Sequence, residues 1–213
     1  LPAIRWNTDK HYLRDLDKAG VAIVPSAFVE PGEDATAALA GFQHAHPTDE
    51  FVAKPAIGAG SRDAQRYHSS DRNDAIAHAR RLLDAGGSVL LQPYLDRVDE
   101  HGETALVFFD GEFSHAIRKG PLLRRGEGPT RALFAAEHIT PRQPDAAELA
   151  LAERTLAAIP FPQPLLYARV DLIHDADGSP RVLELELTEP SLFFAHAAGS
   201  AARFARAIVA RAA

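Results

Sequence analysis

The amino-acid sequence predicts an α+β protein in which helices pack on antiparallel sheets. Apolar residues recur with the helical period in some segments, whereas other segments are short Val- and Leu-rich runs typical of strands. Two strand-like segments flank Asp110-Gly111, a dipeptide typical of a two-residue hairpin loop. Two further strands are joined by a polar turn at residues 175–178. Because short turns connect antiparallel neighbours, the sheets are expected to be antiparallel.

Five segments have helical periodicity. In the first, Thr8 and Asp9 are candidate N-caps that precede an apolar stripe. The third ends at Gly86-Gly87, which is typical of a helix C-terminus. The predicted helices span residues 8–19, 35–46, 74–85, 145–158 and 199–212.

Strands are predicted between these helices. They span residues 21–24, 50–55, 88–95, 104–109, 113–119, 166–174 and 181–187. Residues 120–141 have no clear period and are rich in Gly, Pro and Arg, which predicts a long functional loop.

Composition excludes several classes of function. The 213 residues include 23 basic and 29 acidic ones, giving a formal net charge of −6. This balance does not favour a nucleic-acid or anionic-membrane partner. The chain has no cysteine and no run of ~20 apolar residues, so we expect neither disulfides nor a membrane span, and a cytoplasmic location. Because the chain starts at Leu1 without a methionine, a preceding segment is expected.

A lysine and a glycine loop form the first candidate site. Lys54 ends a predicted strand, and Gly58, Gly60 and Ser61 follow it in a flexible loop. Glycine lets backbone amides approach an anion closely, and a lysine adds a point charge suited to phosphate. The loop lacks the Walker arrangement, so on these residues alone an ordinary turn remains the alternative.

A group of carboxylates forms the second candidate site. Strand alternation places Glu184 and Glu186 on one face and residues 183, 185 and 187 on the other, with neighbours on a face ~6.6 Å apart. At an effective dielectric of 20, two such charges repel by ~2.5 kcal/mol, so a covered face needs a cation. A hairpin would bring Asp171 opposite them, which suits Mg²⁺. The alternative is a solvated face, where water screens the repulsion.

The order of these segments resembles the ATP-grasp superfamily, most closely its bacterial glutathione-synthetase-like branch and its cycloserine-forming branch of O-ureido-D-serine cyclo-ligases. Six segments carry the resemblance, which runs from about Trp6 to Phe194. They are Asn7-Thr8-Asp9-Lys10, Val52-Ala53-Lys54-Pro55 with its glycine loop, Gln92-Pro93-Tyr94-Leu95, Gly102-Glu103-Thr104, the strand from Val107 to Arg118, and Arg169-Val170-Asp171 with the segment from Glu184 to Ser191.

The resemblance implies an ATP-dependent ligase that joins a carboxylate to an amine through an acyl phosphate, on an amino-acid-like or peptide-like small molecule, with intramolecular cyclisation as one form. It implies that ATP is held by Lys10, Lys54, Gly58, Gly60, Ser61, Gln92, Pro93, Tyr94, Leu95 and Glu103. Two Mg²⁺ ions, for which Mn²⁺ can substitute, would be bound by Asp171, Glu184 and Glu186. Arg118 and Arg169 would be the catalytic residues.

The resemblance also implies an ATP-grasp fold with a small lid and a larger core. Residues 1–20 would contribute a helix to the nucleotide site, 21–93 would form the lid, and 94–213 would form the core with the metal site. The sequence departs from the family in two ways: Glu186 stands where Asn is usual, and the N-terminal domain that usually comes first is not in this chain. The alternative function is a non-catalytic, regulatory ATP-binding module. Either form can self-associate as a homo-oligomer.

Overall fold

Two antiparallel sheets organise the chain in a computed structural model, which describes residues 1–212 except 125, 127, 129–137 and 163. The first sheet has the strand order β1-β4-β2-β3 and the second has the order β7-β6-β5-β8-β9. The strands of the first are β1 (Ala27–Val29), β2 (Glu50–Pro55), β3 (Gln65–His68) and β4 (Val89–Pro93). Those of the second are β5 (Glu103–Phe109), β6 (Glu112–Lys119), β7 (Ile139–Arg142), β8 (Tyr167–His174) and β9 (Pro180–Glu186).

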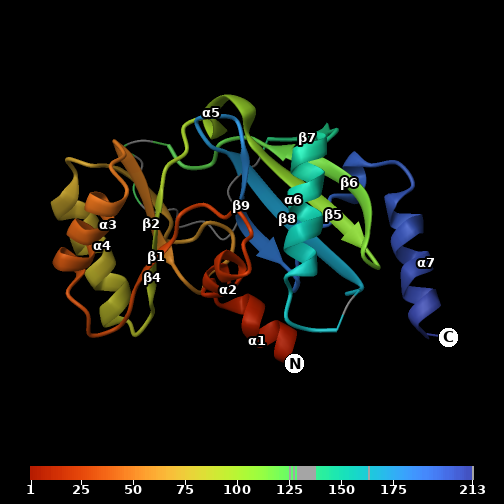
Figure 1. The fold of residues 1–213 in the computed structure, drawn as a ribbon, viewed down its shortest axis with the longest axis horizontal. Helices are drawn as coiled ribbons and strands as arrows, with labels where there is room; N and C mark the ends of the chain where they lie inside the picture. Colours follow the sequence, from red (N-terminus) through yellow and green to blue (C-terminus); the bar gives the residue numbers. More distant parts are fainter. Residues whose placement is uncertain (125, 127, 129–137, 163, 213) are drawn as a thin grey trace.

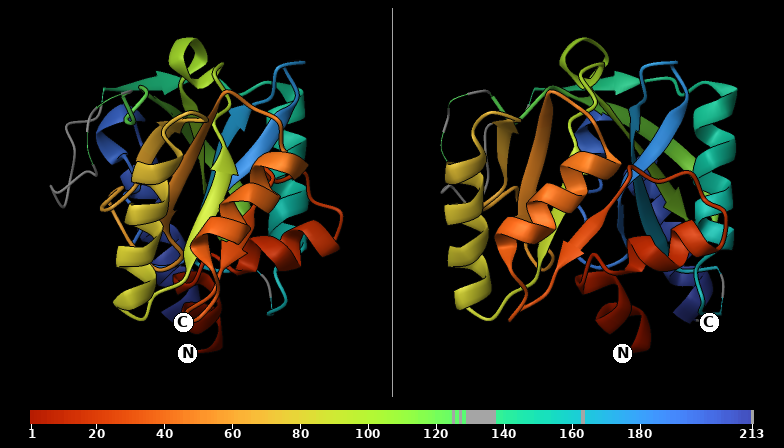
Figure 2. Two further views of the ribbon diagram at one scale, coloured as in Figure 1. Left: turned by 90° about the vertical axis from the view of Figure 1, so that its left-hand side faces the viewer. Right: turned by 60° about the vertical axis from the view of Figure 1, so that its left-hand side comes forward.

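Helices flank the two sheets (Figure 1). They are α1 (Pro2–Thr8), α2 (Tyr12–Lys18), α3 (Ala35–Ala45), α4 (Arg72–Asp84), α5 (Val98–His101), α6 (Ala146–Ala157) and α7 (Ser200–Ala212), with a 3-10 turn at Phe194–His196. Figure 2 shows α3 and α4 lying side by side over one face of the first sheet. Helix α6 packs on β8 and β9, and α7 packs on β5 and β6.

Each sheet has its own apolar core. Phe51 and Leu91 of the first sheet pack against Leu39 of α3 and Leu82 of α4. The second core lies under α2 and α6 and includes Leu106 of β5 among its fully buried residues. The face of the first sheet that carries Phe51 and Leu91 is therefore covered, and the opposite face is turned toward the second sheet.

The strongest local signals are confirmed. Asp110 and Gly111 form the two-residue loop between β5 and β6, and both have positive φ (53° and 82°), as a type I′ turn requires. The helix predicted over residues 145–158 is α6, which Asp145 caps in a capping box with Glu148 that was not predicted, since each side chain accepts a hydrogen bond from the other residue's backbone N–H. Asp171 pairs directly with Glu184, as the hairpin predicted.

Several boundaries differ from the prediction. The helix predicted over residues 8–19 is only α2, and α1, which precedes it, was missed; Lys10 lies between them. Residues 21–24 make only an isolated bridge, from Ile23 to Val182. Strands β1, β3 and β7 and helix α5 were missed, because elements of three or four residues are too short to show a period. Strand β7 also contains Pro141, which an edge strand tolerates. The predicted loop at 120–141 lies partly outside the described residues.

Within the described ranges, none of the helices has both the length and the apolar character that crossing a bilayer requires.

Candidate functional site

A cavity of about 700 Å³ lies between the two sheets. The glycine loop, the ends of β2 and β4, and the turn between α1 and α2 line it from one side. Lys119 of β6, Arg169 of β8, and the segment that follows β9 line it from the other. Of the residues predicted for a site, those that line it are Lys10, Lys54, Gly58, Gly60, Ser61, Gln92, Pro93, Tyr94, Leu95, Glu103, Arg169, Glu184 and Glu186.

Lys10 joins three distant parts of the chain. Its backbone N–H donates to the Ala56 carbonyl at 3.0 Å, which ties the α1–α2 turn to the end of β2. Its ammonium donates to the Gly58 carbonyl at 3.0 Å and lies 3.1 Å from a carboxylate oxygen of Glu184. The lysine therefore connects the glycine loop to the carboxylate group.

Lys54 lies on the face of β2 that lines the cavity. Burial lowers the pKa of its ammonium to about 8, a shift that nearby Lys10 reinforces and Glu184 partly offsets. The site therefore holds an amine that is only partly charged above neutral pH and that an anionic ligand would recharge.

The three predicted carboxylates converge. Asp171, Glu184 and Glu186 each offer an oxygen within 4.8 Å of the others. Hard oxygen donors at this spacing fit a divalent cation such as Mg²⁺. A register shift in β9 lets Asp171 pair with Glu184 and Leu172 with Val182, so Leu183 is bulged and also lines the cavity, contrary to strict alternation.

Besides Lys10, which lies beside Glu184, two further cations contact this group. The Arg169 guanidinium donates to both oxygens of Asp171 at 2.8 Å and also to Glu186. The Lys119 ammonium donates to Asp171 at 2.6 Å and to Glu103. Burial opposes ionisation of Asp171, but Arg169 and Lys119 outweigh it and hold the pKa of that carboxyl well below its usual range.

The outer carboxyls titrate near neutral pH. Burial raises the pKa of Glu186 to about 7 against the opposing effect of Arg169. Burial likewise raises the pKa of Glu103 to about 7, although Lys119 opposes this. Glu184 differs, because Lys10 and Lys54 outweigh its burial and lower its pKa. Asp171 and Glu184 are therefore ionised at neutral pH, whereas Glu186 and Glu103 are partly protonated there and would lose their protons when a cation binds.

Arg118, which the resemblance implied to be catalytic, does not line the cavity, and its catalytic role stays a prediction. Its side chain donates to the carbonyls of His101 (2.7 Å) and Glu100 (2.8 Å) at α5, not into the cavity. Arg118 pairs with Thr104, whose hydroxyl contacts Glu148 of α6, whereas Lys119 pairs with Glu103 on the cavity side. A register shift between β5 and β6 pairs Glu103 with Lys119, whereas an unshifted hairpin would pair Glu103 with Arg118.

The segment after β4 is held by a charged residue of β3. The Arg66 guanidinium lies 3.5 Å from the ring centroid of Tyr94 and pairs with Glu50 and Asp99. The Tyr94 hydroxyl donates to Asp99 at 2.5 Å. These contacts fix the backbone of Gln92-Pro93-Tyr94-Leu95 where it lines the cavity.

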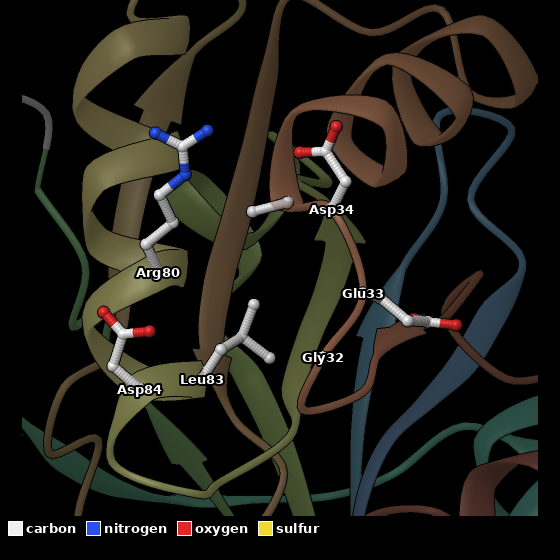
Figure 3. Close-up of a pocket in the computed structure, with 7 residues that line it drawn as sticks. Gly32, Glu33, Asp34, Arg80, Leu83 and Asp84 are labelled. Atoms are coloured by element: carbon white, nitrogen blue, oxygen red, sulfur yellow. The ribbon is translucent and has the colours of Figure 1, made fainter.

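A smaller cavity of about 250 Å³ lies between α3 and α4 (Figure 3). Arg80, Leu83 and Asp84 of α4 line it together with residues 32–35 at the start of α3. It contains none of the predicted site residues.

A known protein and several solved structures are similar to this chain. A scan against protein-family models found no match. The chain is 46% identical over 215 residues to the cycloserine biosynthesis protein DcsG of Streptomyces lavendulae, covering 99% of this chain and 72% of that protein. It superposes on the crystal structure of D-cycloserine synthetase DcsG with a TM-score of 0.92 and 45% identity, over 99% of this chain and 72% of the other.

More distant solved structures share the fold. The ATP-grasp ligase PsnB, complexed with minimal precursor, Mg and ADP, matches with a TM-score of 0.68 and 19% identity, over 98% of this chain and 60% of PsnB. A D-alanine–D-alanine ligase from Bacillus anthracis matches with a TM-score of 0.70 and 17% identity, over 95% of this chain and 66% of the ligase.

Proposed function

We propose that this chain, which belongs to the ATP-grasp ligases in the family of D-cycloserine synthetase, cyclises an amino-acid-like substrate. Members of this family are ATP- and Mg²⁺-dependent ligases that form C–N bonds, and so is this chain. The relatedness to DcsG favours a ring-closing reaction within one small molecule, such as an O-ureido-serine, over the joining of two molecules. A cytoplasmic enzyme supplied by the cellular ATP pool is part of this proposal; its oligomeric state stays a prediction.

The observation that carries the proposal is the convergence of cations and carboxylates in one cavity. Lys10 and Lys54 would bind the phosphates of ATP, beneath the loop of Gly58, Gly60 and Ser61. Asp171, Glu184 and Glu186 would hold Mg²⁺, which neutralises phosphate charge and orients the β- and γ-phosphates. The segment of Gln92, Pro93, Tyr94 and Leu95 would hold the base, with Glu103 beyond it.

In the reaction, a substrate carboxylate oxygen attacks the γ-phosphorus, the bond to the β–γ bridging oxygen breaks, and ADP leaves. A nitrogen then attacks the acyl carbon, loses its proton and expels phosphate. Such steps need positioning and charge neutralisation rather than covalent help from the protein. Arg169 and Lys119, which both line the cavity, would stabilise the transferring phosphoryl group, and Lys119 would take the role that the resemblance implied for Arg118. Closure of the glycine loop would exclude water from the acyl phosphate.

A substrate screen tests the proposal. Phosphate release with Mg-ATP would be measured against a panel of amino acids and O-ureido-amino acids, with product mass by mass spectrometry. We expect turnover with an O-ureido-amino acid. The mass of the cyclic product should be lower than that of the acid by at least the one water that ring closure removes. Turnover that requires a second amino acid would replace cyclisation by intermolecular ligation. ATP binding without acceptor-dependent turnover would instead favour a regulatory module.

A further inference from the structure

The side chain of Gln92 has one unsatisfied end. Gln92 lies on β4 opposite Val52 of β2, on the face that also carries Lys54 and lines the cavity. The residue is 2% exposed, and its amide nitrogen donates to the Ser26 hydroxyl at 3.0 Å. Its amide oxygen has no hydrogen-bond partner among the residues that the structure describes. A buried acceptor without a partner is unfavourable, which points to a donor supplied by a ligand.

Ser26 determines which end of the amide is left unsatisfied. Strand pairing of Ala27 with Leu91 places Ser26 beside Gln92. The Ser26 hydroxyl donates its single proton to the Val24 carbonyl at 2.8 Å, so its oxygen can only accept from Gln92. Val24 is fully buried and is itself anchored to β9, because its N–H donates to the Val182 carbonyl at 2.9 Å. The Val24–Ser26–Gln92 chain therefore leaves the amide oxygen, and not the NH₂ group, without a hydrogen-bond partner among the described residues.

We propose that Ser26 is a positioning residue that holds Gln92 with its acceptor toward the nucleotide base, so that the enzyme selects a purine with an amino group at C6. This inference rests on the proposed ATP site. An adenine amino group donates to the Gln92 oxygen, whereas the C6 carbonyl of guanine or hypoxanthine would present a second acceptor to it. A site built around a donor discriminates against a ligand that lacks it, since the buried acceptor then stays unpaired.

The test measures base discrimination by calorimetry with the intact chain. ATP and purine riboside 5′-triphosphate, which lacks only the amino group, would be titrated in the presence of Mg²⁺. We expect the wild type to bind ATP about tenfold more tightly, the effect of one well-placed hydrogen bond. Ser26→Ala allows the side-chain amide of Gln92 to rotate by about 180°, so the ratio of the two nucleotide affinities should fall to roughly threefold or less. Ser26→Thr keeps a hydroxyl and should restore the wild-type ratio.

Ser88→Ala is the matched control, because the Ser88 hydroxyl donates to Glu30 at 2.6 Å and not to Gln92; its ratio should equal that of the wild type. Gln92→Leu removes the acceptor and should give the lowest ratio of the two nucleotide affinities. It replaces Ser26→Ala as the test if that variant does not fold. A ratio in Ser26→Ala, or in Gln92→Leu, equal to that of the wild type overturns the inference while ATP binding still stands. If the wild type binds neither nucleotide, the proposed function itself fails.

Discussion

Lys54 links the charge state of a single residue to nucleotide affinity. Its folded pKa of about 8 lies below the ordinary lysine value because burial penalises the charge. The folded protein therefore binds fewer protons here than the unfolded chain between pH 8 and the ordinary pKa. The stability cost of burying this charge is full below pH 8 and is relieved as the pH rises.

The affinity for ATP depends on pH in the opposite direction to stability, because the phosphates of ATP favour the charged form of the Lys54 amine. We predict that ATP affinity falls as the pH rises through about 8, and that binding at pH 8.5 takes up a fraction of a proton. Titration calorimetry in two buffers with different ionisation enthalpies measures this uptake. Lys54→Arg, which stays charged, should abolish it; an uptake that persists in this variant would assign the proton to another group.

Lys119 and Arg118 are adjacent residues with different surroundings. Lys119 contacts Asp171 and Glu103 in the cavity, whereas Arg118 contacts two backbone carbonyls at α5. Loss of a cation that stabilises a transferring group typically lowers kcat by about 10²–10³-fold. We therefore predict a loss of this order for Lys119→Met in steady-state phosphate release, and a change within about threefold for Arg118→Met. Equal losses in the two variants would contradict the assignment.

At the scale of elements, the turn from α5 into β5 supports the position of β6. Gly102 has a φ of 71°, and a Cβ there would collide with the Lys119 carbonyl and the Arg118 guanidinium. We predict that Gly102→Ala lowers the free energy of unfolding by about 3 kcal/mol, from backbone strain plus displacement of the strand end, and lowers activity through Lys119.

The matched control is Gly86→Ala, which ends α4 with a φ of 81° but has open space around it. It should cost only about 1 kcal/mol, the strain alone, and leave activity unchanged. Denaturant unfolding of both variants separates the two effects. Equal losses of stability in the two variants would mean that displacing the end of β6 does not change the free energy of unfolding, which would contradict the prediction.

At the scale of the whole molecule, the site needs both sheets. Lys54 and the glycine loop belong to the side of the first sheet, and the carboxylates belong to the second. A ligand that bridges them must stabilise the chain as a whole. The proposed division into residues 21–93 and 94–213 stays a prediction, although the strands β1 to β4 all precede residue 94.

We predict that Mg-ATP at a hundredfold excess over its Kd stabilises the fold by about 2.7 kcal/mol, which raises Tm by about 5–10 °C. ATP with a chelator should give a smaller shift. Glu184→Gln should remove the difference between the two, because it removes a proposed metal ligand and a partner of Lys10. Glu153→Gln on the exposed side of α6 is the control and should behave as the wild type. A Tm that is insensitive to Mg-ATP would contradict the site.

The sequence by itself determined the features whose signals are local. The Asp110-Gly111 loop, the helix predicted over residues 145–158 and the pairing of Asp171 with Glu184 each depend on residues a few positions apart or on one hairpin. The order of the motifs along the chain was sufficient to indicate the family.

Only the tertiary structure decided which side chains meet. One extra residue in a strand turns every following side chain to the other face, and such shifts occur in both the β5–β6 and the β8–β9 pairs. They bring Lys119 in place of Arg118 into the cavity. Ser26 and Gln92 meet only because β1 pairs with β4 across 66 positions of sequence. No local period encodes such a contact, because register depends on the packing of the whole sheet.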